Sequence, residues 1–115
     1  MRLLVDVLVG FIAIEHIGFL VLEMFLWTHP IGLRVFAQSA EAAQSSKLLA
    51  ANQGLYNGFL AAGLIWGLIT GDASIKLFFA LCVLVAGVFG GITVKRSILL
   101  VQAAPALIAT VLLLL

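Results

Sequence analysis

Charged side chains are scarce in this sequence. Only 10% of its 115 residues are Asp, Glu, Lys or Arg, and 64% are hydrophobic, whereas a soluble domain carries about 25% charged residues. The formal net charge is +1, so there is no excess of basic residues of the kind that binds nucleic acids. The composition therefore predicts an integral membrane protein with the lipid bilayer as its main partner and no nucleic-acid ligand.

Cysteine is almost absent. The single residue Cys82 excludes an intrachain disulfide, and we interpret it as a small core residue rather than a reactive thiol. The first apolar stretch is too long for a cleaved signal peptide, carries carboxylates within it and is not followed by a small-x-small cleavage site. A signal peptide is therefore not expected.

Four apolar segments meet or approach the roughly 20 residues that a membrane span requires. They are Leu3–Trp27, Leu48–Thr70, Ile75–Val94 and Ile98–Leu115. Turn-forming or charged residues separate them, at positions 28–30, 71–74 and 95–96. The sequence predicts an all-α fold, a bundle of four transmembrane helices that forms one domain over residues 1–115.

The first connection is longer than a turn. Within Gly32–Lys47, apolar residues recur at helical spacing, at Leu33, Phe36, Ala40 and Ala43. We expect a short interfacial helix between the first two spans, with a polar loop as the alternative.

Basic residues are unevenly distributed between the two ends of the predicted spans. One end carries four of them, at Arg34, Lys47, Lys95 and Arg96. The other end carries Arg2 and Lys76, offset by Asp6 and Asp72. Because Lys and Arg concentrate in cytoplasmic connections, this distribution predicts that both termini lie outside the cytoplasm.

The first predicted span contains ionisable residues at Glu15, His16 and Glu23. A charged group in hydrocarbon costs about 2.5–3.5 kcal/mol even on lenient insertion scales. At about 100° per residue the three side chains fall within one arc of about 100° on the helix. They therefore share a face, and we expect that face to point into the protein or into an aqueous cavity.

Amide side chains are predicted at similar depths on other spans. The second span opens with Asn52, Gln53, Tyr56 and Asn57, and the fourth has Gln102 near its start. Together with the ionisable residues, these side chains predict a ligand-binding pocket. For any single amide, a hydrogen bond between helices is the alternative interpretation.

Three glycine pairs have the small-xxx-small spacing that brings helices close together. They are Gly54/Gly58, Gly63/Gly67 and Gly87/Gly91. The first two pairs fall on opposite sides of the second span, so we expect neighbours on both of its faces. One of these neighbours is a second copy of the chain if the protein is a homodimer.

Two sequence blocks carry a resemblance to a known family. They are Glu15–His16 with Glu23–Thr28, and the run LAANQGLYNGFLAAG at positions 49–63. Together with Gln102–Pro105 later in the chain, these blocks resemble a bacterial family of small integral membrane proteins, domain of unknown function number 1304. The resemblance covers nearly the whole chain. It implies a four-span protein of the bacterial inner membrane, without an established activity, substrate or cofactor.

The leading functional prediction is a small protein that binds or transports a proton, a metal ion or a small cationic solute. Glu15, His16 and Glu23 would handle the ligand, and they are also the candidate metal ligands, although they share one helix and match no metal motif. No cofactor is required by the sequence. The alternatives are a structural or accessory protein with a polar packing core, and an enzyme acting on a lipid or quinone, for which no nucleophile motif is present.

Overall fold

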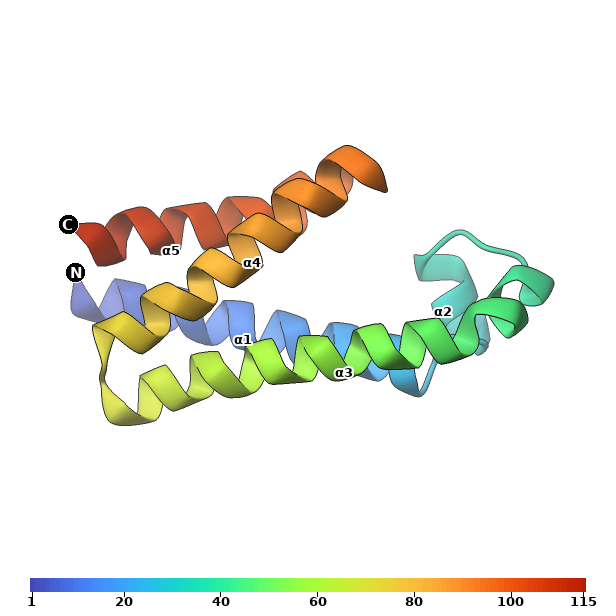
Figure 1. The fold of residues 1–115 in the computed structure, drawn as a ribbon, viewed down its shortest axis with the longest axis horizontal. Helices are drawn as coiled ribbons and strands as arrows, with labels where there is room; N and C mark the ends of the chain where they lie inside the picture. The colour runs from blue at the N-terminus through green and yellow to red at the C-terminus, as the bar shows by residue number, and fades with distance from the viewer. The chain divides into compact units, whose positions relative to one another are not determined.

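The computed structural model describes all 115 residues, and the chain consists of helices joined by short connections (Figure 1). The elements are α1 (Arg2–Met24), α2 (Pro30–Val35), α3 (Ala40–Thr70), α4 (Ala73–Thr93), the π-helix η1 (Leu99–Ala103) and α5 (Ala104–Leu114). The predicted all-α class is confirmed. The observed helix ends lie within a few residues of the predicted breaks, except in the first connection.

The turn between α3 and α4 has the local chemistry that its sequence predicts. Gly71 adopts a φ of 70°, a left-handed conformation that ends helices and that glycine adopts without strain. Asp72 then caps α4, because its Oδ1 accepts hydrogen bonds from the backbone N–H of Ser74 and Ile75 at 2.8 and 3.3 Å.

The first connection differs from the predicted helix over Gly32–Lys47, whose bounds are wrong. Pro30 starts the six-residue α2, and the chain then breaks at Ala37, which has a φ of 50°. The Ser39 hydroxyl accepts a hydrogen bond from the Ala42 N–H at 3.1 Å, which caps a new helix. Residues 40–47 therefore form the first turns of α3, continuous with the predicted second span.

The last helical segment begins with π geometry. Residues Leu99–Ala103 form η1, directly before Pro105 in the first turn of α5. Gly87 of α4 faces this segment, and a Cβ there would lie 2.6 Å from the Ala103 nitrogen. The absence of a side chain at Gly87 therefore allows α4 to approach the backbone of η1 closely.

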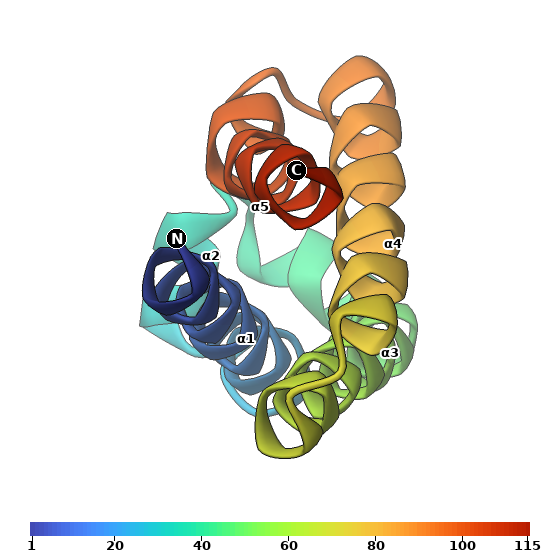
Figure 2. The ribbon, with the colours of Figure 1, turned by 90° about the vertical axis from the view of Figure 1, so that its left-hand side faces the viewer.

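The residues group into two compact units, and each is described by itself. The first unit comprises Met1–Ile14 and Leu60–Leu115, and its apolar core draws on four helical segments. Figure 2, viewed from the end at which both termini lie, shows these parts of α1, α3, α4 and α5 around that core. The core residues are Val5, Val9, Ile12, Ala13, Leu64, Ala80, Val83, Ala106 and Ala109.

The second unit comprises Glu15–Phe59, that is, the end of α1, α2 and the start of α3. Trp27, in the connection after α1, contacts both α3 and the segment that precedes it. Its indole N–H donates a hydrogen bond to the Ser46 hydroxyl of α3 at 3.1 Å, and its ring contacts Phe36 at a centroid distance of 4.7 Å. The division does not test the predicted single domain, which stays a prediction.

The glycines of α3 contact different helices in the two units. In the second unit, Gly54 and Gly58 pack against α1, where a Cβ would meet Met24 and Leu20. In the first unit, Gly63 and Gly67 pack against Phe79 and Lys76 of α4. The prediction that α3 has neighbours on both faces is confirmed.

Two helices, α1 and α4, are long and apolar enough to cross a membrane. The other two predicted spans do not reach this standard. The amides near the start of α3 reduce its apolar character, and Leu99–Leu114 is too short. The four-span arrangement is therefore not established by these helices alone.

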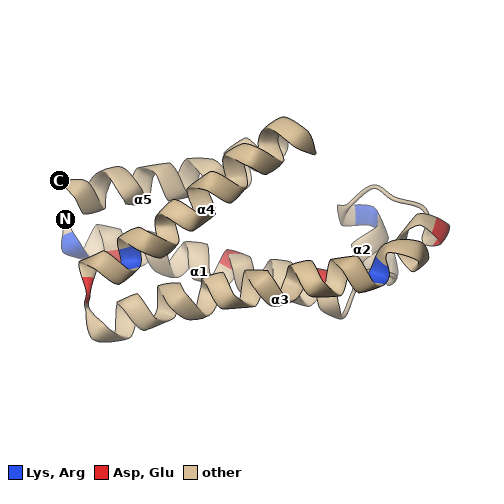
Figure 3. Cartoon of the chain, in the orientation of Figure 1, with Lys and Arg blue, Asp and Glu red and all other residues tan.

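An ion pair joins α1 and α4 within the first unit. Lys76 Nζ lies 2.6 Å from Asp6 Oδ1, with side-chain exposures of 6% and 38%. The aliphatic part of Lys76 packs on Gly67 of α3. From the sequence, Asp6 and Lys76 were expected only as charges that flank the predicted spans. In the structure each lies one turn inside its helix, and the two side chains are paired. Figure 3 shows charged residues in colour at the helix ends and acidic positions, in red, also within α1.

Candidate functional site

Glu23 is held by an amide from another helix. It lies in the last turn of α1, and its Oε1 accepts a hydrogen bond of 2.5 Å from Asn57 Nδ2 of α3. Gly54, one turn earlier on α3, has no side chain to keep α1 away, and its Cβ position lies 3.1 Å from Glu23 Cβ. The close approach of the two helices therefore brings carboxylate and amide together.

Glu15 has a different environment two turns earlier on α1. It makes no hydrogen bond, its Oε1 is buried without a donor, and 11% of its side chain is exposed. The nearest basic atom is Nδ1 of His16, at 4.0 Å. This distance exceeds that of a hydrogen bond, so the carboxylate of Glu15 is left without a close donor.

His16 is fully buried and packs edge-on against Phe19, with ring centroids 5.2 Å apart and planes at 71°. The imidazole therefore lies between the ring of Phe19 and the carboxylate of Glu15. The side chains at positions 15, 16 and 23 thus divide into a neighbouring pair and a separate, hydrogen-bonded carboxylate.

The other predicted site residues are distributed more widely. Asn52, Gln53 and Tyr56 are exposed on α3, and Tyr56 lies in a tilted ring contact with Phe59. Gln102 is half-buried in η1, which belongs to the first unit. Within the second unit, only Asn57 among the predicted polar residues of α3 is bonded to a carboxylate of α1.

The three candidate metal ligands do not form a metal site. No group of three His, Cys, Asp or Glu side chains has the geometry to hold an ion. The reason is their spacing, because Glu15 and Glu23 are eight residues apart, about 12 Å along the helix axis.

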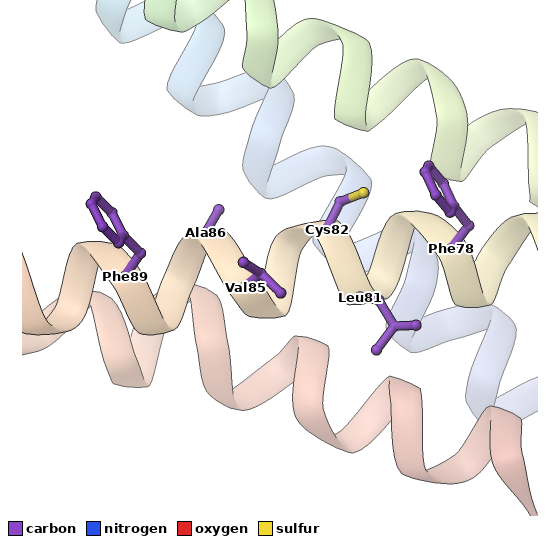
Figure 4. Close-up of a pocket in the computed structure, with 6 residues that line it drawn as sticks. All are labelled: Phe78, Leu81, Cys82, Val85, Ala86 and Phe89. Atoms are coloured by element: carbon purple, nitrogen blue, oxygen red, sulfur yellow. The ribbon is translucent and has the colours of Figure 1, made fainter.

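A shallow apolar groove runs along one side of α4. It is lined by Phe78, Leu81, Cys82, Val85, Ala86 and Phe89 (Figure 4). The lining contains no charged or amide side chain, so this groove has no group that could orient a polar ligand. Cys82 lines this groove and is half-buried, so it does not belong to the apolar core in which it was expected from the sequence.

These features define a small all-helical protein in which two helices are apolar enough to cross a membrane. Acidic and amide side chains lie within its helices. Residues 10–114 match the family described as "Protein of unknown function (DUF1304)", and the chain belongs to this family. It is also similar to "Uncharacterized protein YpaA" of Lactococcus lactis, with 27% identity over 115 residues, 96% of this chain and 97% of the relative. No solved structure matches the chain.

Proposed function

We propose that this protein is a multi-pass membrane protein that binds a proton or a small cation at Glu15 and carries it across the bilayer. One observation carries the proposal: the carboxylate of Glu15, in the middle part of an apolar helix, has no hydrogen-bond donor and a buried oxygen.

The energies favour a ligand at Glu15 over a purely structural role. An ionised carboxylate within a span costs about 2.5–3.5 kcal/mol on insertion scales. A hydrogen bond between membrane helices returns on average about 0.6 kcal/mol, and at most about 2. Glu23 has such a bond and Glu15 has none. Apart from the contact with His16 at 4.0 Å, the fold does not offset the cost of Glu15, whereas a bound proton or cation would remove the charge that causes it.

A four-span topology follows if α1 and α4 both cross the bilayer. The Asp6–Lys76 ion pair shows that the two helices begin at the same end of the first unit. Both would then cross in the same direction, and the chain between them must return. Only α3 is long enough for this, since its 31 residues extend about 46 Å, against about 30 Å of hydrocarbon.

The segment Leu99–Leu114 supplies the final crossing in this topology. At about 24 Å it is shorter than the hydrocarbon layer, a mismatch that local thinning of the bilayer accommodates at modest cost. The excess of Lys and Arg in the first and third connections supports a bacterial inner-membrane protein with both termini outside the cytoplasm.

Within this proposal the other residues have supporting roles. His16 lies against Phe19 and beside Glu15, where its imidazole accepts or returns a proton. The Asn57 amide holds Glu23 and fixes α1 against α3. Asn52, Gln53 and Tyr56, which belong to the same unit as Glu15, complete the proposed pocket as polar groups that a hydrated ligand meets.

A structural or accessory role is the second candidate, and the Glu23–Asn57 bond favours it, because this bond alone accounts for one of the two carboxylates. The two candidates differ in what Glu15→Gln does. The substitution keeps the size of the side chain and removes its charge, so a structural role predicts no change in ion movement.

The test uses the full chain reconstituted in proteoliposomes, with charge movement recorded electrically after jumps in pH or in ammonium and guanidinium concentration. We expect transient currents from the wild type and from Gln44→Ala, an exposed position of α3 outside the proposed pocket, and a loss of at least tenfold in Glu15→Gln. If wild-type vesicles give no more current than empty vesicles under any of these jumps, the proposal is wrong. If Glu15→Gln carries wild-type current, the accessory role replaces it.

A further inference from the structure

Two basic side chains of the second unit have no counter-charge. Arg34, in the last turn of α2, and Lys47 of α3 are exposed. Neither belongs to an ion pair, since the ion pairs of the structure join other residues. Glu41 is the one acidic residue between positions 28 and 47, and it pairs with neither cation. The surface formed by α2 and the start of α3 therefore carries unpaired positive charge.

Trp27 brings together the two segments that carry these charges. Its indole N–H donates to the hydroxyl of Ser46, directly before Lys47. Its ring contacts Phe36, two residues after Arg34. Figure 3 shows the blue positions of α2 and α3 at the same end of the second unit. The two cations therefore lie on one surface, on segments that meet at the same indole.

Gln38, between these segments, has a hydrogen-bond donor that the chain leaves unused. Its backbone N–H donates to the Leu33 carbonyl at 3.1 Å, which holds the residue against the end of α2, four positions after Arg34. Its side chain is half-buried, and the Nε2 atom is covered but donates to no atom of the chain. A covered donor without an acceptor costs free energy, and an oxygen ligand from outside the chain would remove this cost.

The exposed apolar side chains of α2 indicate what covers this surface. Ile31 and Val35 are exposed, and their spacing from Arg34 makes the three neighbours on one helix face. Gly32 is buried, and its Cβ position lies against the Leu26 carbonyl. A helix face that combines apolar side chains with a cation is typical of the bilayer interface, where both kinds of group find a partner. A soluble anion would cover the charges alone.

We propose that Arg34, Gln38 and Lys47 bind the headgroup phosphate of an anionic phospholipid, whose acyl chains lie against the apolar side chains of α2. Phosphate oxygens accept charge-assisted hydrogen bonds from a guanidinium, and anionic lipids of the cytoplasmic leaflet attract basic side chains. In the proposed topology the connection that contains α2 lies on that side. The inference rests on the membrane location in the proposed function, and not on a cation at Glu15.

The test uses Trp27 as a reporter of the lipid next to the site. The full chain with Trp66→Phe, which leaves Trp27 as the one tryptophan, is reconstituted in bilayers containing lipids brominated in their acyl chains. Quenching by brominated phosphatidylglycerol is compared with quenching by brominated phosphatidylcholine. We expect phosphatidylglycerol to bind at least fivefold more tightly, because one basic side chain near an anionic surface favours association by about fivefold. High salt should reduce this ratio.

The variants test each group of the site. Arg34→Gln and Lys47→Gln should each lower the ratio at least threefold and together bring it close to one. Arg2→Gln is the matched control, because it removes the same charge from the start of α1 and should keep the wild-type ratio. Gln38→Leu should lower the ratio at least twofold. Its control is Gln44→Leu, at an exposed position of α3, which should not.

The inference is overturned if the two lipids quench Trp27 equally, if the double variant keeps the preference, or if Arg2→Gln loses as much of it. It also fails if Gln38→Leu keeps the full ratio, since the attraction is then diffuse and no headgroup is bound. Arg34→Lys keeps the charge and should keep at least half of the ratio. If the glutamine variants lose their helical circular dichroism, this variant and the salt dependence of the wild type decide.

The outcomes separate this inference from the proposed function. If Trp27 shows no lipid preference but vesicles give Glu15-dependent currents, this inference fails and the proposed function stands. If neither lipid quenches Trp27 at all, the membrane location is wrong, and both fail.

Discussion

The side-chain amide of Asn57 on α3 donates a hydrogen bond to the carboxylate of Glu23 on α1. Two turns away on the same helix, the buried Oε1 of Glu15 accepts no hydrogen bond, and the nearest basic atom is His16 Nδ1 at 4.0 Å. Both carboxylates lie in one apolar helix, where an ionised group costs free energy. A hydrogen bond offsets this cost at Glu23 and not at Glu15. The contrast separates the stability of the protein from its proposed activity.

Replacing Asn57 by Ala should destabilise the protein. The substitution leaves a half-buried carboxylate without its donor, and an unsatisfied group of this kind costs about 1–3 kcal/mol. We expect a decrease of this size in the free energy of unfolding, measured by SDS titration in mixed micelles. Asn52→Ala is the matched control, because Asn52 is exposed and should change stability by less than about 0.5 kcal/mol. Equal effects of the two variants would show that the bond does not contribute.

The two partners of the Asp6–Lys76 pair should differ when each is removed. Asp6→Ala leaves a buried ammonium without its counter-charge, and breaking a fully buried pair costs about 3–5 kcal/mol. Because Asp6 is 38% exposed, we expect a smaller loss, about 2–3 kcal/mol on the same scale.

Lys76→Met should cost less than Asp6→Ala. Methionine keeps the aliphatic contact with Gly67, and the remaining carboxylate is partly solvated. Chemical unfolding of the two variants side by side checks the order. The reverse order would mean that the aliphatic packing of Lys76, not its charge, stabilises this end of the first unit.

The local elements of the fold could be predicted from the sequence because their signals are local. Gly71 and Asp72 end one helix and begin the next by their own backbone and side-chain chemistry. The glycine pairs of α3 indicated neighbours on two faces, since a missing side chain matters only where another helix approaches. The junction at Ala37–Ala40 could not be predicted, because nothing in the type of residue marks Ala37 for a positive φ.

The site was only partly predictable for a similar reason. Periodicity placed Glu15, His16 and Glu23 on one face of a helix, but it could not say which carboxylate would obtain a donor. That choice depends on how closely α3 approaches α1 at Gly54, which brings Asn57 to Glu23. The buried Asp6–Lys76 pair joins residues 70 positions apart, and no local pattern relates them.

Alanine substitutions at two helix glycines should have opposite effects. At Gly87, a Cβ would lie 2.6, 2.8 and 2.9 Å from atoms of Ala103, two of them backbone. Since a backbone cannot move away as a side chain can, Gly87→Ala should destabilise by about 1–3 kcal/mol. At Gly18 nothing lies in the way, and Gly18→Ala should stabilise by up to about 1 kcal/mol through helix propensity. Thermal unfolding of both variants tests these expectations. A Gly87→Ala variant that is more stable than the wild type would contradict the close approach of α4 to Ala103.

Neutralising the two carboxylates should separate stability from activity. Glu15→Leu removes a charge whose carboxylate accepts no hydrogen bond. It should therefore leave the free energy of unfolding unchanged or raise it by about 1–2 kcal/mol. A gain of this size is typical when a functional residue that the fold accommodates poorly is replaced. Glu23→Leu, by contrast, leaves the Asn57 amide without its acceptor and should lower the free energy of unfolding by about 1–3 kcal/mol. Unfolding in mixed micelles gives the stabilities, and charge movement in vesicles gives the activities. A destabilised Glu15→Leu would mean that Glu15 stabilises the fold through its contact with His16, and the reason for assigning it a ligand would be lost.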